Sequence, residues 1–546
     1  MKHNMVAYDD VTGAPLEVEK VEARKVEMEF FRNREVYKKV HKDVCEAAGM
    51  KPIPTRWVDV NKGDNDRPDY RSRLVAKEYR SDSRPELYAA TPPLEALRAI
   101  LSQAATLRRG GEPRCIMVND IKRAYFYARA RRPVFIIIPE EDREEGDENM
   151  VGELNLSMYG TRDAAQNWQE TFAAHLVGLG FTQGVSNPCL FYHRAKDIKT
   201  MVHGDDYVSA ASQKELEWLR GELDKKFETK STIIGPKEGQ GKEVKVLNRV
   251  IRMTEKGVEH EADQRHAEII VENMGMKDSK GVATPGTRDD SEQDEEENEE
   301  ELTGTEATMF RAISARANYL ALDRPDIQYA TKEICRKMSK PRKKDWRRLA
   351  RLAKYLAKRP RLVSVYKWQE QTDFVDVYTD ANWAGCTETR KSTSGGAAMC
   401  GLHCLRTWSK TQATIALSSG ESELFGTVKA TCEGIGMASM LADLGIVAKI
   451  RVFADASAAL AIIHRKGVGK VRHLDTGVLW LQQKELQEAV EFLKVAGMKN
   501  PSDLMTKNVD QALAEQHLSA LGFTFADGRA ESTAKICQLC DKSALV

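Results

Sequence analysis

The chain has 546 residues, enough for about three or four domains. Its hydrophobic fraction of 41% supplies real cores and excludes a chain that is disordered throughout. No apolar run approaches the roughly 18 residues of a membrane span, and the first residues lack a signal-peptide core. Ten cysteines, most of them scattered singly, indicate reduced thiols rather than a disulfide framework. We therefore expect a protein that is neither secreted nor embedded in a membrane.

The net charge of +1 averages two strong local biases. Residues 289–301 are almost wholly acidic, which predicts a solvated, self-repelling linker. Residues 336–361 are densely basic, and their cations lie close together on two predicted helices. Such a surface suits a phosphodiester backbone, although a merely soluble helix has the same pattern. Near-neutral net charge therefore does not exclude a polynucleotide partner.

Two predicted elements open the chain. Residues 18–48 have the pattern of a charged, amphipathic helical lead-in. Residues 55–64 and 70–77 are strand-like runs separated by turn signals, which predicts a β-hairpin. Arg71 and Arg73 alternate onto one face of its second strand, where guanidinium groups suit a nucleotide triphosphate. An ordinary solvated strand face is the alternative.

The next apolar run, residues 115–118, is followed by Asn119 and Asp120. An aspartate at the end of a buried strand is held on a rigid element, as a metal ligand requires. Tyr125 follows five residues later in an aromatic-rich segment. Its ring can form a floor against a nucleotide sugar, where bulk excludes a 2′-hydroxyl, or it can simply pack in the core.

Residues 201–210 predict a tight β-hairpin with Asp205 and Asp206 at its tip. Adjacent carboxylates repel each other unless a cation lies between them. Nucleotidyl transfer needs such a site, because paired divalent metals clamp the attacking and leaving oxygens. Most Asp-Asp pairs are solvated turns, but Asp120 upstream supplies a third carboxylate in a suitable setting.

A second set of acidic residues lies in the last third of the chain, at predicted strand ends and helix starts. Converging carboxylates from separate elements can bind two Mg²⁺ ions about 3.5–4 Å apart, as a two-metal nuclease requires. Any one such acid is more often a surface residue than a ligand. The set consists of Asp380, Glu421 or Glu423, Asp455 and Asp503.

The motifs occur in a fixed order. In the first half they are D-I-K-R-A-Y-F at 120–126, L-S-M-Y-G-T-R-D at 156–163, L-G-F at 179–181, S-N-P-C-L-F at 186–191 and H-G-D-D at 203–206. This series resembles the reverse transcriptase of copia-type LTR retrotransposons, whose usual forms are D-V-K-x-A-F, L-Y-G-L-K-Q-x-x-x-W, L-G-F, S-D-P-C-L-F and Y-V-D-D. The hairpin at 55–77 similarly resembles the fingers motifs W-V-F-x-x-K and Y-K-A-R-L-V-A-K of that family.

The second half resembles the ribonuclease H of the same elements. Its motifs are T-D-A-N-W-A-G at 379–385, R-K-S-T-S-G at 390–395, A-L-S-S-G-E-S-E at 416–423, D-A-S at 455–457 and S-D-L-M-T-K at 502–507. The usual forms are D-x-D-W-A-G, R-K-S-T-S-G, A-L-S-S-x-E-A-E, C-D-N-x-S-A and L-A-D-x-x-T-K. The resemblance covers roughly residues 50–510 and is specific in order and spacing.

The resemblance implies a role for each matching residue. Catalytic metal ligands of the polymerase would be Asp120, Asp205 and Asp206; triphosphate contacts would be Arg71, Arg73 and Lys77; the steric gate would be Tyr125; and catalytic metal ligands of the ribonuclease would be Asp380, Glu423, Asp455 and Asp503. Glu421 stays a rival to Glu423, because the motif holds two glutamates.

Two positions depart from the family pattern. Asp163 stands where copia-type enzymes usually have glutamine, and His203-Gly204 replaces the usual Tyr-Val before the aspartate pair. A carboxylate in place of an amide changes charge and hydrogen-bond donors, and glycine predicts a looser hairpin. Neither change removes a metal ligand.

The implied fold class is α+β: a right-hand polymerase with fingers, thumb and an antiparallel palm sheet, followed by an α/β ribonuclease H-like domain. The expected divisions are a helical lead-in at 1–50, fingers and palm at 51–230, thumb and connection at 231–287, an acidic linker at 288–304, a basic helical connection at 305–372, the ribonuclease H-like domain at 373–515 and a tail at 516–546.

The implied function is RNA-directed DNA polymerase with ribonuclease H activity, from the C-terminal part of a copia-type polyprotein. Each active site would hold two Mg²⁺ ions, with Mn²⁺ as an alternative. Expected partners are an RNA template, a DNA primer, the RNA–DNA hybrid, dNTPs and other element-encoded proteins, in a cytoplasmic retrotransposon particle or in the nucleus. The alternatives are a catalytically degenerate nucleic-acid-binding protein and a chain in which only the ribonuclease is active.

Overall fold

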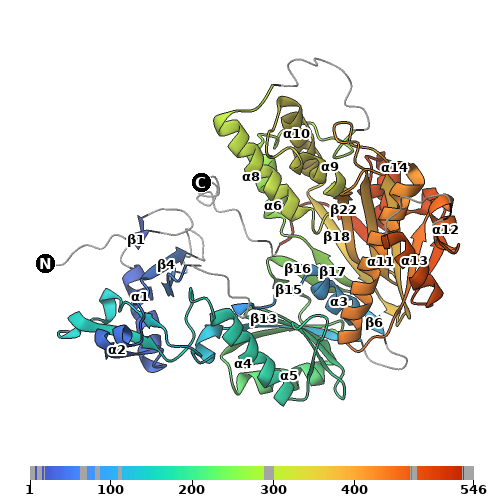
Figure 1. Cartoon of the computed structure of the whole chain (residues 1–546). Coiled ribbons are helices and arrows are strands. Elements are labelled where there is room, and N and C mark those ends of the chain that lie inside the picture. Colours follow the sequence, from blue (N-terminus) through green and yellow to red (C-terminus); the bar gives the residue numbers. More distant parts are fainter. Residues whose placement is uncertain are drawn as a thin grey trace.

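The computed structural model describes residues 7–8, 15–16, 19–61, 70–79, 87–107, 113–287, 300–467, 469, 476–531 and 533. Most of the predicted acidic linker, residues 288–299, lies outside the described residues. No helix in the described part of the chain is long and apolar enough to cross a membrane. In Figure 1 the chain's first elements lie at the left, a large sheet at the bottom and the last sheet at the right.

A six-stranded antiparallel sheet, the palm sheet, carries the first set of predicted acidic residues. In sheet order its strands are β10 (Thr182–Gln183), β11 (Leu190–His193), β12 (Ile198–His203), β13 (Asp206–Ala211), β7 (Cys115–Ile121) and β14 (Thr229–Ile234), and its helices are α3 (Leu94–Ala104), α4 (Ala164–Gly178) and α5 (Gln213–Asp224). Side chains of β7 alternate between faces, with Ile116 and Val118 on the α3 side and Met117 on the side of α4 and α5. Both faces are buried, which explains the continuous apolar run of this strand.

The fingers region combines a three-stranded sheet, a hairpin and two helices. Its elements are α1 (Glu19–Asn33), β3 (Tyr37–His41), α2 (Lys42–Ala47), β4 (Thr55–Asn61), β5 (Tyr70–Ala76), β8 (Phe135–Ile136) and β9 (Met150–Leu154). The predicted hairpin is the β4–β5 pair. Helix α1 packs on β5, where Met28 and Phe31 join Leu74 in one buried cluster. The predicted helical lead-in at 18–48 is therefore helical only in α1 and α2, because β3 between them pairs with β9, and α1 is part of the fingers core.

A second antiparallel sheet, the connection sheet, joins segments that lie far apart in the chain. It contains β15 (Glu243–Val246), β16 (Arg249–Thr254), β17 (Gly257–Glu261), β18 (Arg361–Lys367) and β25 (Phe523–Ala526), and beside it lie α6 (Arg265–Asn273), α8 (Gly304–Leu320), α9 (Pro325–Cys335) and α10 (Lys343–Lys358). The four helices share one buried cluster, which includes Phe310, Ile327 and Leu352. Segments from three predicted divisions, 231–287, 305–372 and 516–546, thus share one sheet.

The last sheet, the ribonuclease H-like sheet, is mixed. In order it contains β22 (His403–Thr411), β21 (Thr393–Cys400), β20 (Phe374–Asn382), β23 (Lys449–Ala454) and β24 (Val490–Lys494), with the helices α11 (Ser419–Asp443), α12 (Ser457–Ile463), α13 (Thr476–Leu486), α14 (Gln511–Ala520) and the 3₁₀ helix η6 (Pro501–Met505). The first three strands are antiparallel, whereas β23 and β24 run parallel to β20. Helix α11 covers one face, and η6 with α14 covers the other.

Short elements complete the fold. They are β1 (Ala7–Tyr8), β2 (Pro15–Leu16), β6 (Thr106–Leu107), β19 (Gln369–Glu370) and the 3₁₀ helices η2 (Ala124–Tyr127), η3 (Glu140–Asp142), η4 (Asp147–Asn149) and η5 (Gly497–Lys499). The predicted fold class is confirmed: an α+β chain with an antiparallel palm sheet precedes an α/β ribonuclease H-like sheet.

Helix α3 lies between the palm sheet and the ribonuclease H-like sheet. Its residues from Ala96 to Ala104 are all buried, and it contacts β12 and β13 on one side and β22 on the other. The Arg98 guanidinium donates hydrogen bonds to the Leu405 carbonyl of β22 at 3.3 Å and to Asp323 at 3.1 Å. Asp323 also accepts a hydrogen bond from Arg249 of β16 at 2.9 Å. One buried carboxylate therefore ties α3 to the connection sheet.

We expect Asp323→Asn to lower the thermal unfolding midpoint strongly, because it leaves two buried guanidinium groups without their carboxylate. Breaking a buried ion pair from one side costs about 3–5 kcal/mol. The exposed Asp278, changed to Asn, is the matched control. Equal midpoints for the two variants, measured by circular dichroism, would contradict this expectation.

Candidate active sites

The palm sheet brings Asp120, Asp205 and Asp206 together at one end of the strands β7 and β13. Asp120 is the penultimate residue of β7, and Asp206 opens the neighbouring strand β13. The two aspartates are direct partners in the antiparallel register. Asp205 lies beside them, and its carbonyl accepts a hydrogen bond from the Ile121 amide at 3.0 Å. The β-sheet therefore gathers carboxylates that are about 85 residues apart in the sequence.

The hairpin tip contains Gly204 and Asp205, between the paired residues His203 and Asp206. Gly204 has φ 63°, in the left-handed region that two-residue hairpin loops favour at this position. The Trp168 indole N–H of α4 donates a hydrogen bond to the Gly204 carbonyl at 2.7 Å. Glycine therefore meets the backbone requirement of this turn, and a buried indole holds the turn in place.

The pKa of Asp206 shows that the close approach of the three carboxylates is electrostatically unfavourable. Burial, together with the negative charges of Asp205 and Asp120, raises the pKa of Asp206 to about 6. A raised carboxyl pKa means that the ionised form lacks a compensating positive charge. The arrangement therefore favours a cation beside these three side chains.

Arg73 of the fingers strand β5 and Tyr125 of η2 lie beside these aspartates. The Arg73 guanidinium lies over the Tyr159 ring, 4.8 Å from its centroid, and the Tyr125 and Tyr159 rings are 4.7 Å apart. Burial and the Asp205 charge raise the pKa of Tyr125, while the Arg73 charge opposes that shift. Arg73, Tyr125 and Asp205 are thus neighbours, and Tyr159 is a member of the site that the sequence analysis did not single out.

The other two predicted triphosphate contacts lie on either side of Arg73 along the chain. Arg71 shares the β5 face of Arg73 and is exposed. Lys77 follows β5, and its backbone N–H donates to the Pro54 carbonyl at 2.8 Å. Its side chain lines a hollow of about 560 Å³ together with Arg56, Val58, Val75, Ala76, Glu78, Tyr79 and Gly160.

Glu27 of α1 is a further charged residue that the sequence analysis missed. It is 2% exposed, and its Oε2 accepts a hydrogen bond from Arg123 Nε at 3.0 Å. Its Oε1 has no hydrogen-bond partner among the described residues. Burial raises the pKa of Glu27, against the opposing charges of Arg123 and Arg73. The available signal was a glutamate four residues before Phe31, on the apolar side of a helix.

Asp163, the residue in place of the usual glutamine, is built into an ion-pair network. Its carboxylate accepts hydrogen bonds from Arg132 at 3.0 Å and from Asn167 at 3.1 Å. Arg132 also pairs with Glu78 at 2.6 Å. Asp163 therefore shares one cation with Glu78, and this network ties the start of α4 to the segment that follows β5.

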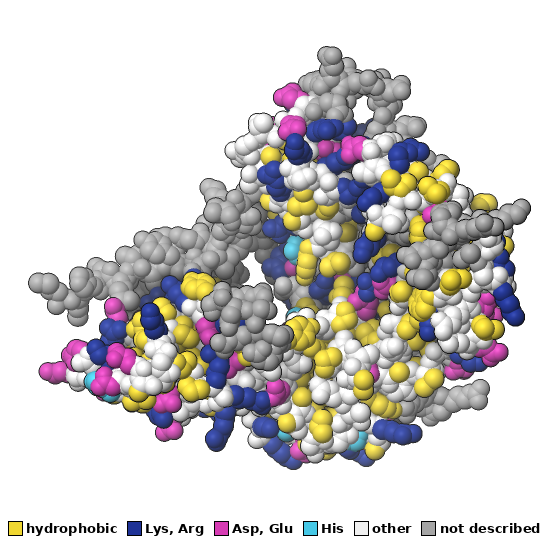
Figure 2. Space-filling model, viewed as in Figure 1, with side chains coloured by type: hydrophobic (Ala, Val, Ile, Leu, Met, Phe, Trp, Pro, Cys, Tyr) yellow, Lys and Arg dark blue, Asp and Glu magenta, His cyan; other side chains and the backbone are white. Residues whose placement is uncertain are grey.

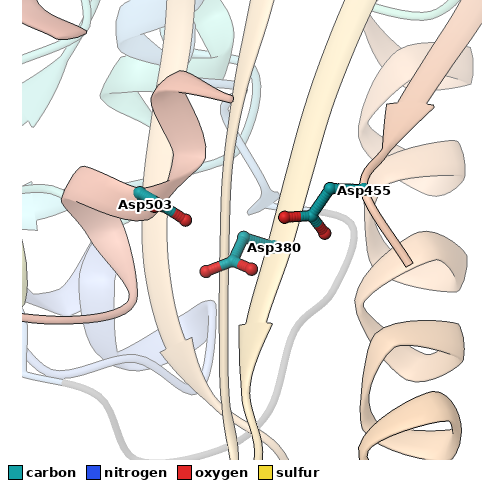
Figure 3. Close-up of side chains that lie close together, drawn as sticks. All are labelled: Asp380, Asp455 and Asp503. Carbon is teal, nitrogen blue, oxygen red and sulfur yellow. The ribbon is translucent and has the colours of Figure 1, made fainter. Parts of the chain in front are cut away.

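The ribonuclease H-like sheet forms a second acidic cluster. Asp380 lies on β20, Asp455 follows the parallel strand β23, and Asp503 lies on η6. Their ligand oxygens lie within 4.8 Å of one another, and Figure 3 shows the Asp503 and Asp455 side chains extending toward Asp380 from either side. The Thr506 hydroxyl donates a hydrogen bond to Asp380.

The two rival glutamates of α11 have different surroundings. Glu421 Oε2 accepts a hydrogen bond from the Leu417 amide at 3.0 Å, close to the N-cap Ser418. Glu423 Oε1 accepts from the Ala381 amide at 3.2 Å, and burial with the charges of Asp380 and Asp455 raises the pKa of Glu423 to about 9. Glu423 is therefore the glutamate beside the acidic cluster.

Lys507 is a residue of this cluster to which the sequence analysis gave no role. Its Nζ lies 2.8 Å from Asp503 Oδ1 and 3.9 Å from Asp380 Oδ2. Burial raises the pKa of Asp380, while the Lys507 ammonium opposes that shift. One cation therefore offsets part of the repulsion among the four acids.

The donor atoms of both sites suit a hard divalent cation. All the acidic side chains of both sites are carboxylates, the ligand type that Mg²⁺ and Mn²⁺ prefer, and in the described residues the ligand oxygens of Asp380, Asp455 and Asp503 lie within 4.8 Å of one another. Glu423 Oε2 is buried without a hydrogen-bond partner in the described part of the chain. A free ligand oxygen beside an acidic cluster fits a metal site.

Comparison with known proteins agrees with this geometry. Residues 37–288, which contain Asp120, Asp205 and Asp206, match the family described as reverse transcriptase (RNA-dependent DNA polymerase). Over 515 residues the chain is 25% identical to the retrovirus-related Pol polyprotein from transposon TNT 1-94 of Nicotiana tabacum. This alignment covers 92% of this chain and 37% of that protein. This chain carries a reverse transcriptase domain of the copia type. The resemblance predicted from its motifs is confirmed.

The copia-type chain has further relatives. It is 25% identical over 489 residues to the retrovirus-related Pol polyprotein from transposon RE1 of Arabidopsis thaliana, covering 86% of this chain and 32% of that protein. It therefore spans about a third of the length of these relatives. A structure of the foamy viral protease-reverse transcriptase in complex with double-stranded DNA has a TM-score of 0.48 and 10% identity, over 90% of this chain and 74% of that one.

The pKa of Asp206 predicts a pH-dependent effect in this copia-type chain. Because its folded pKa is about 6, above the ordinary value of about 3.9, ionised Asp206 destabilises the fold as the pH rises between these values. In metal-free buffer we expect Asp206→Asn to be more stable than the unchanged chain by about 1–2 kcal/mol at pH 8 and equally stable below about pH 4.

Thermal unfolding across this pH range, with a chelator present, measures the difference. The control variant is again Asp278→Asn, whose side chain is exposed. Added Mg²⁺ should stabilise the unchanged chain more than the Asp206→Asn variant. A gain that stays constant with pH would contradict the expectation.

Proposed function

We propose that this chain is an RNA-directed DNA polymerase that also has ribonuclease H activity. The observation that carries the proposal is the direct pairing of Asp120 and Asp206 across neighbouring strands, inside the segment that matches the reverse transcriptase family. Directly opposed residues of an antiparallel pair lie about 4.5–5.5 Å apart, which holds both carboxylates on a rigid support. This placement favours a cation site over a solvated turn.

The polymerase site would use its own residues in three ways. Asp120, Asp205 and Asp206 would hold two Mg²⁺ ions, with Mn²⁺ as an alternative, and the bound metal would supply charge neutralisation at the attacking and leaving oxygens. The carboxylates would thus orient a primer 3′-hydroxyl toward the α-phosphate of a dNTP. Nucleotide addition would therefore take place at the end of β7 and β13 that carries the three aspartates.

Side chains of the fingers, together with Tyr125 of η2, would bind the nucleotide. Arg71 and Arg73 would engage triphosphate oxygens, since guanidinium groups bind phosphate bidentately, and Lys77 would add a point charge. Tyr125 would form the floor of the sugar site and exclude a 2′-hydroxyl. The support for this is the contact series from Arg73 through Tyr159 to Tyr125, which holds all three side chains next to Asp205.

The ribonuclease site would use four acids. Asp380, Glu423, Asp455 and Asp503 would hold Mg²⁺ and position the RNA strand of the hybrid for hydrolysis. The close approach of three aspartates and the burial of Glu423 beside them support this assignment. The partners would be an RNA template, a DNA primer, their hybrid and dNTPs.

A basic surface supports polynucleotide binding. Figure 2 shows Lys and Arg side chains over the α8 and α10 part of the molecule. Arg347 and Lys358 of α10 are exposed, and Lys354 is half-buried on the same helix. Clustered cations of this kind bind phosphodiester backbones without reading the sequence.

Primer extension and hybrid cleavage test the proposal together. We expect Mg²⁺-dependent extension of a DNA primer on an RNA template, abolished in the Asp205→Asn/Asp206→Asn variant, which should still cut an RNA–DNA hybrid. We expect the converse from Asp380→Asn: normal extension without cleavage. The two variants control for each other, because each leaves the other acidic cluster intact.

The other outcomes identify the alternatives. Cleavage without extension would leave a ribonuclease H alone. Neither activity, with binding of the hybrid retained, would favour a catalytically degenerate nucleic-acid-binding protein. A chelator should abolish both activities, and Mg²⁺ or Mn²⁺ should restore them.

We expect Arg73→Ala to raise the KM for dNTPs about tenfold or more, because hydrogen bonds to a charged partner contribute about 1.5–3 kcal/mol. Steady-state primer extension at varied dNTP concentration measures this. Glu27→Gln should raise KM less, since Glu27 acts on the nucleotide only through its neighbours Arg123 and Arg73.

The matched control for Glu27→Gln is Glu29→Gln, an exposed residue of the same helix. It should leave KM unchanged. Equal KM values for Arg73→Ala and the unchanged chain would refute the triphosphate assignment of Arg73.

A further inference from the structure

The loop between β10 and β11 has no role in either proposed reaction. It carries the Ser186-Asn187-Pro188 part of a motif that the resemblance singled out, and it lies at the edge of the palm sheet. This loop meets the last residue of α11, Asp443, from the ribonuclease H-like sheet. The contact joins residues more than 250 positions apart.

Asp443 accepts hydrogen bonds from four donors of this loop. Its Oδ1 accepts from the Val185 amide at 2.9 Å and from the Ser186 amide at 3.3 Å. Its Oδ2 accepts from the Asn187 amide at 2.8 Å and from the Ser186 hydroxyl. Hydrogen bonds to an ionised acceptor are roughly twice as strong as neutral ones, and one carboxylate makes all four here.

Two glycines allow the two surfaces to approach this closely. A Cβ at Gly184 would lie 2.7 Å from Asp443 Oδ2 and 2.5 Å from the Asn187 carbonyl. Gly445, just beyond α11, has φ 79°, and a Cβ there would overlap the Tyr192 ring of β11. Side chains are therefore excluded on both sides of the contact.

This contact is the second attachment between the same two sheets. The first is α3, which packs under the palm sheet and bonds to β22 through Arg98. Leu441 and Leu444 at the end of α11 belong to the same buried cluster as Leu190 of β11. A second attachment, at a distance from α3, adds a restraint on the orientation of the ribonuclease H-like sheet relative to the palm sheet.

We infer that Asp443 is a positioning residue that fixes the ribonuclease H-like sheet against the β10–β11 loop of the palm sheet and thereby sets where the RNA is cut. The inference rests on the proposed function, because it requires one hybrid to occupy both sites. If both acidic clusters belong to one rigid body, the length of hybrid between the primer 3′ end and the cut is constant. Releasing Asp443 then changes the position of the cut without changing either set of acids.

The experiment maps cuts in an end-labelled RNA template annealed to a recessed DNA primer, with the full chain. We expect the unchanged chain to give one dominant cut at a fixed distance from the primer 3′ end. Asp443→Ala and Gly184→Ala should each spread or displace this cut by about one nucleotide or more, while primer extension keeps its rate. Asp443→Asn retains one acceptor oxygen and should give an intermediate pattern.

Asp373→Ala removes an exposed carboxylate from the same sheet region and is the matched control, with an unchanged pattern expected. Amide hydrogen exchange supplies a readout that does not depend on cleavage. The Val185 and Asn187 amides should be protected in the unchanged chain and should exchange faster in Asp443→Ala.

Two failures remain distinguishable. An unchanged chain that leaves the hybrid uncut would refute the ribonuclease proposal. A cut pattern that is identical in the unchanged chain and in Asp443→Ala, with the two amides released in the variant, would overturn the positioning role of Asp443. Unprotected amides in the unchanged chain would overturn it as well.

Discussion

The structure depends on the burial of α3 between two sheets. Its apolar residues between Ala96 and Ala104 lie in one continuous hydrophobic cluster that runs from the palm strands to the ribonuclease H-like strands. A helix with both sides buried must satisfy any charge it carries, and Arg98 does so through Asp323 and the Leu405 carbonyl. The polymerase-like and nuclease-like halves therefore form one packed unit rather than two separate bodies.

That rigid unit makes two unfavourable acidic clusters tolerable. The raised pKa values of Asp206 and Glu423 show that neither carboxyl group is fully compensated by the protein. Such repulsion is typical of functional sites, where stability is given up for chemistry. The support comes from strand pairing around Asp120 and from Thr506 and Lys507 around Asp380.

Two of the departures from the family pattern, Asp163 and Gly204, have structural explanations. Asp163 pairs with Arg132, which it shares with Glu78, so part of its negative charge is offset. Gly204 adopts a left-handed conformation that glycine suits, and the Trp168 indole restrains the turn. Both residues are therefore held by side chains from other elements, Arg132 for Asp163 and Trp168 of α4 for Gly204.

The sequence by itself determined the local features: the order of motifs, the β4–β5 hairpin, the β12–β13 hairpin that carries Asp205 and Asp206, and the placement of Asp120, Asp380 and Asp455 on or directly after strands. These follow from residue periodicity and turn chemistry, which act over a few residues. Only the tertiary structure decided which acids converge, that Glu423 rather than Glu421 faces the cluster, and that α1 contributes Glu27. The tertiary structure alone also placed β25 in the connection sheet and Asp443 beside the β10–β11 loop of the palm sheet. Those contacts join residues that are tens to hundreds of positions apart, and no local pattern encodes which distant surfaces will pack together.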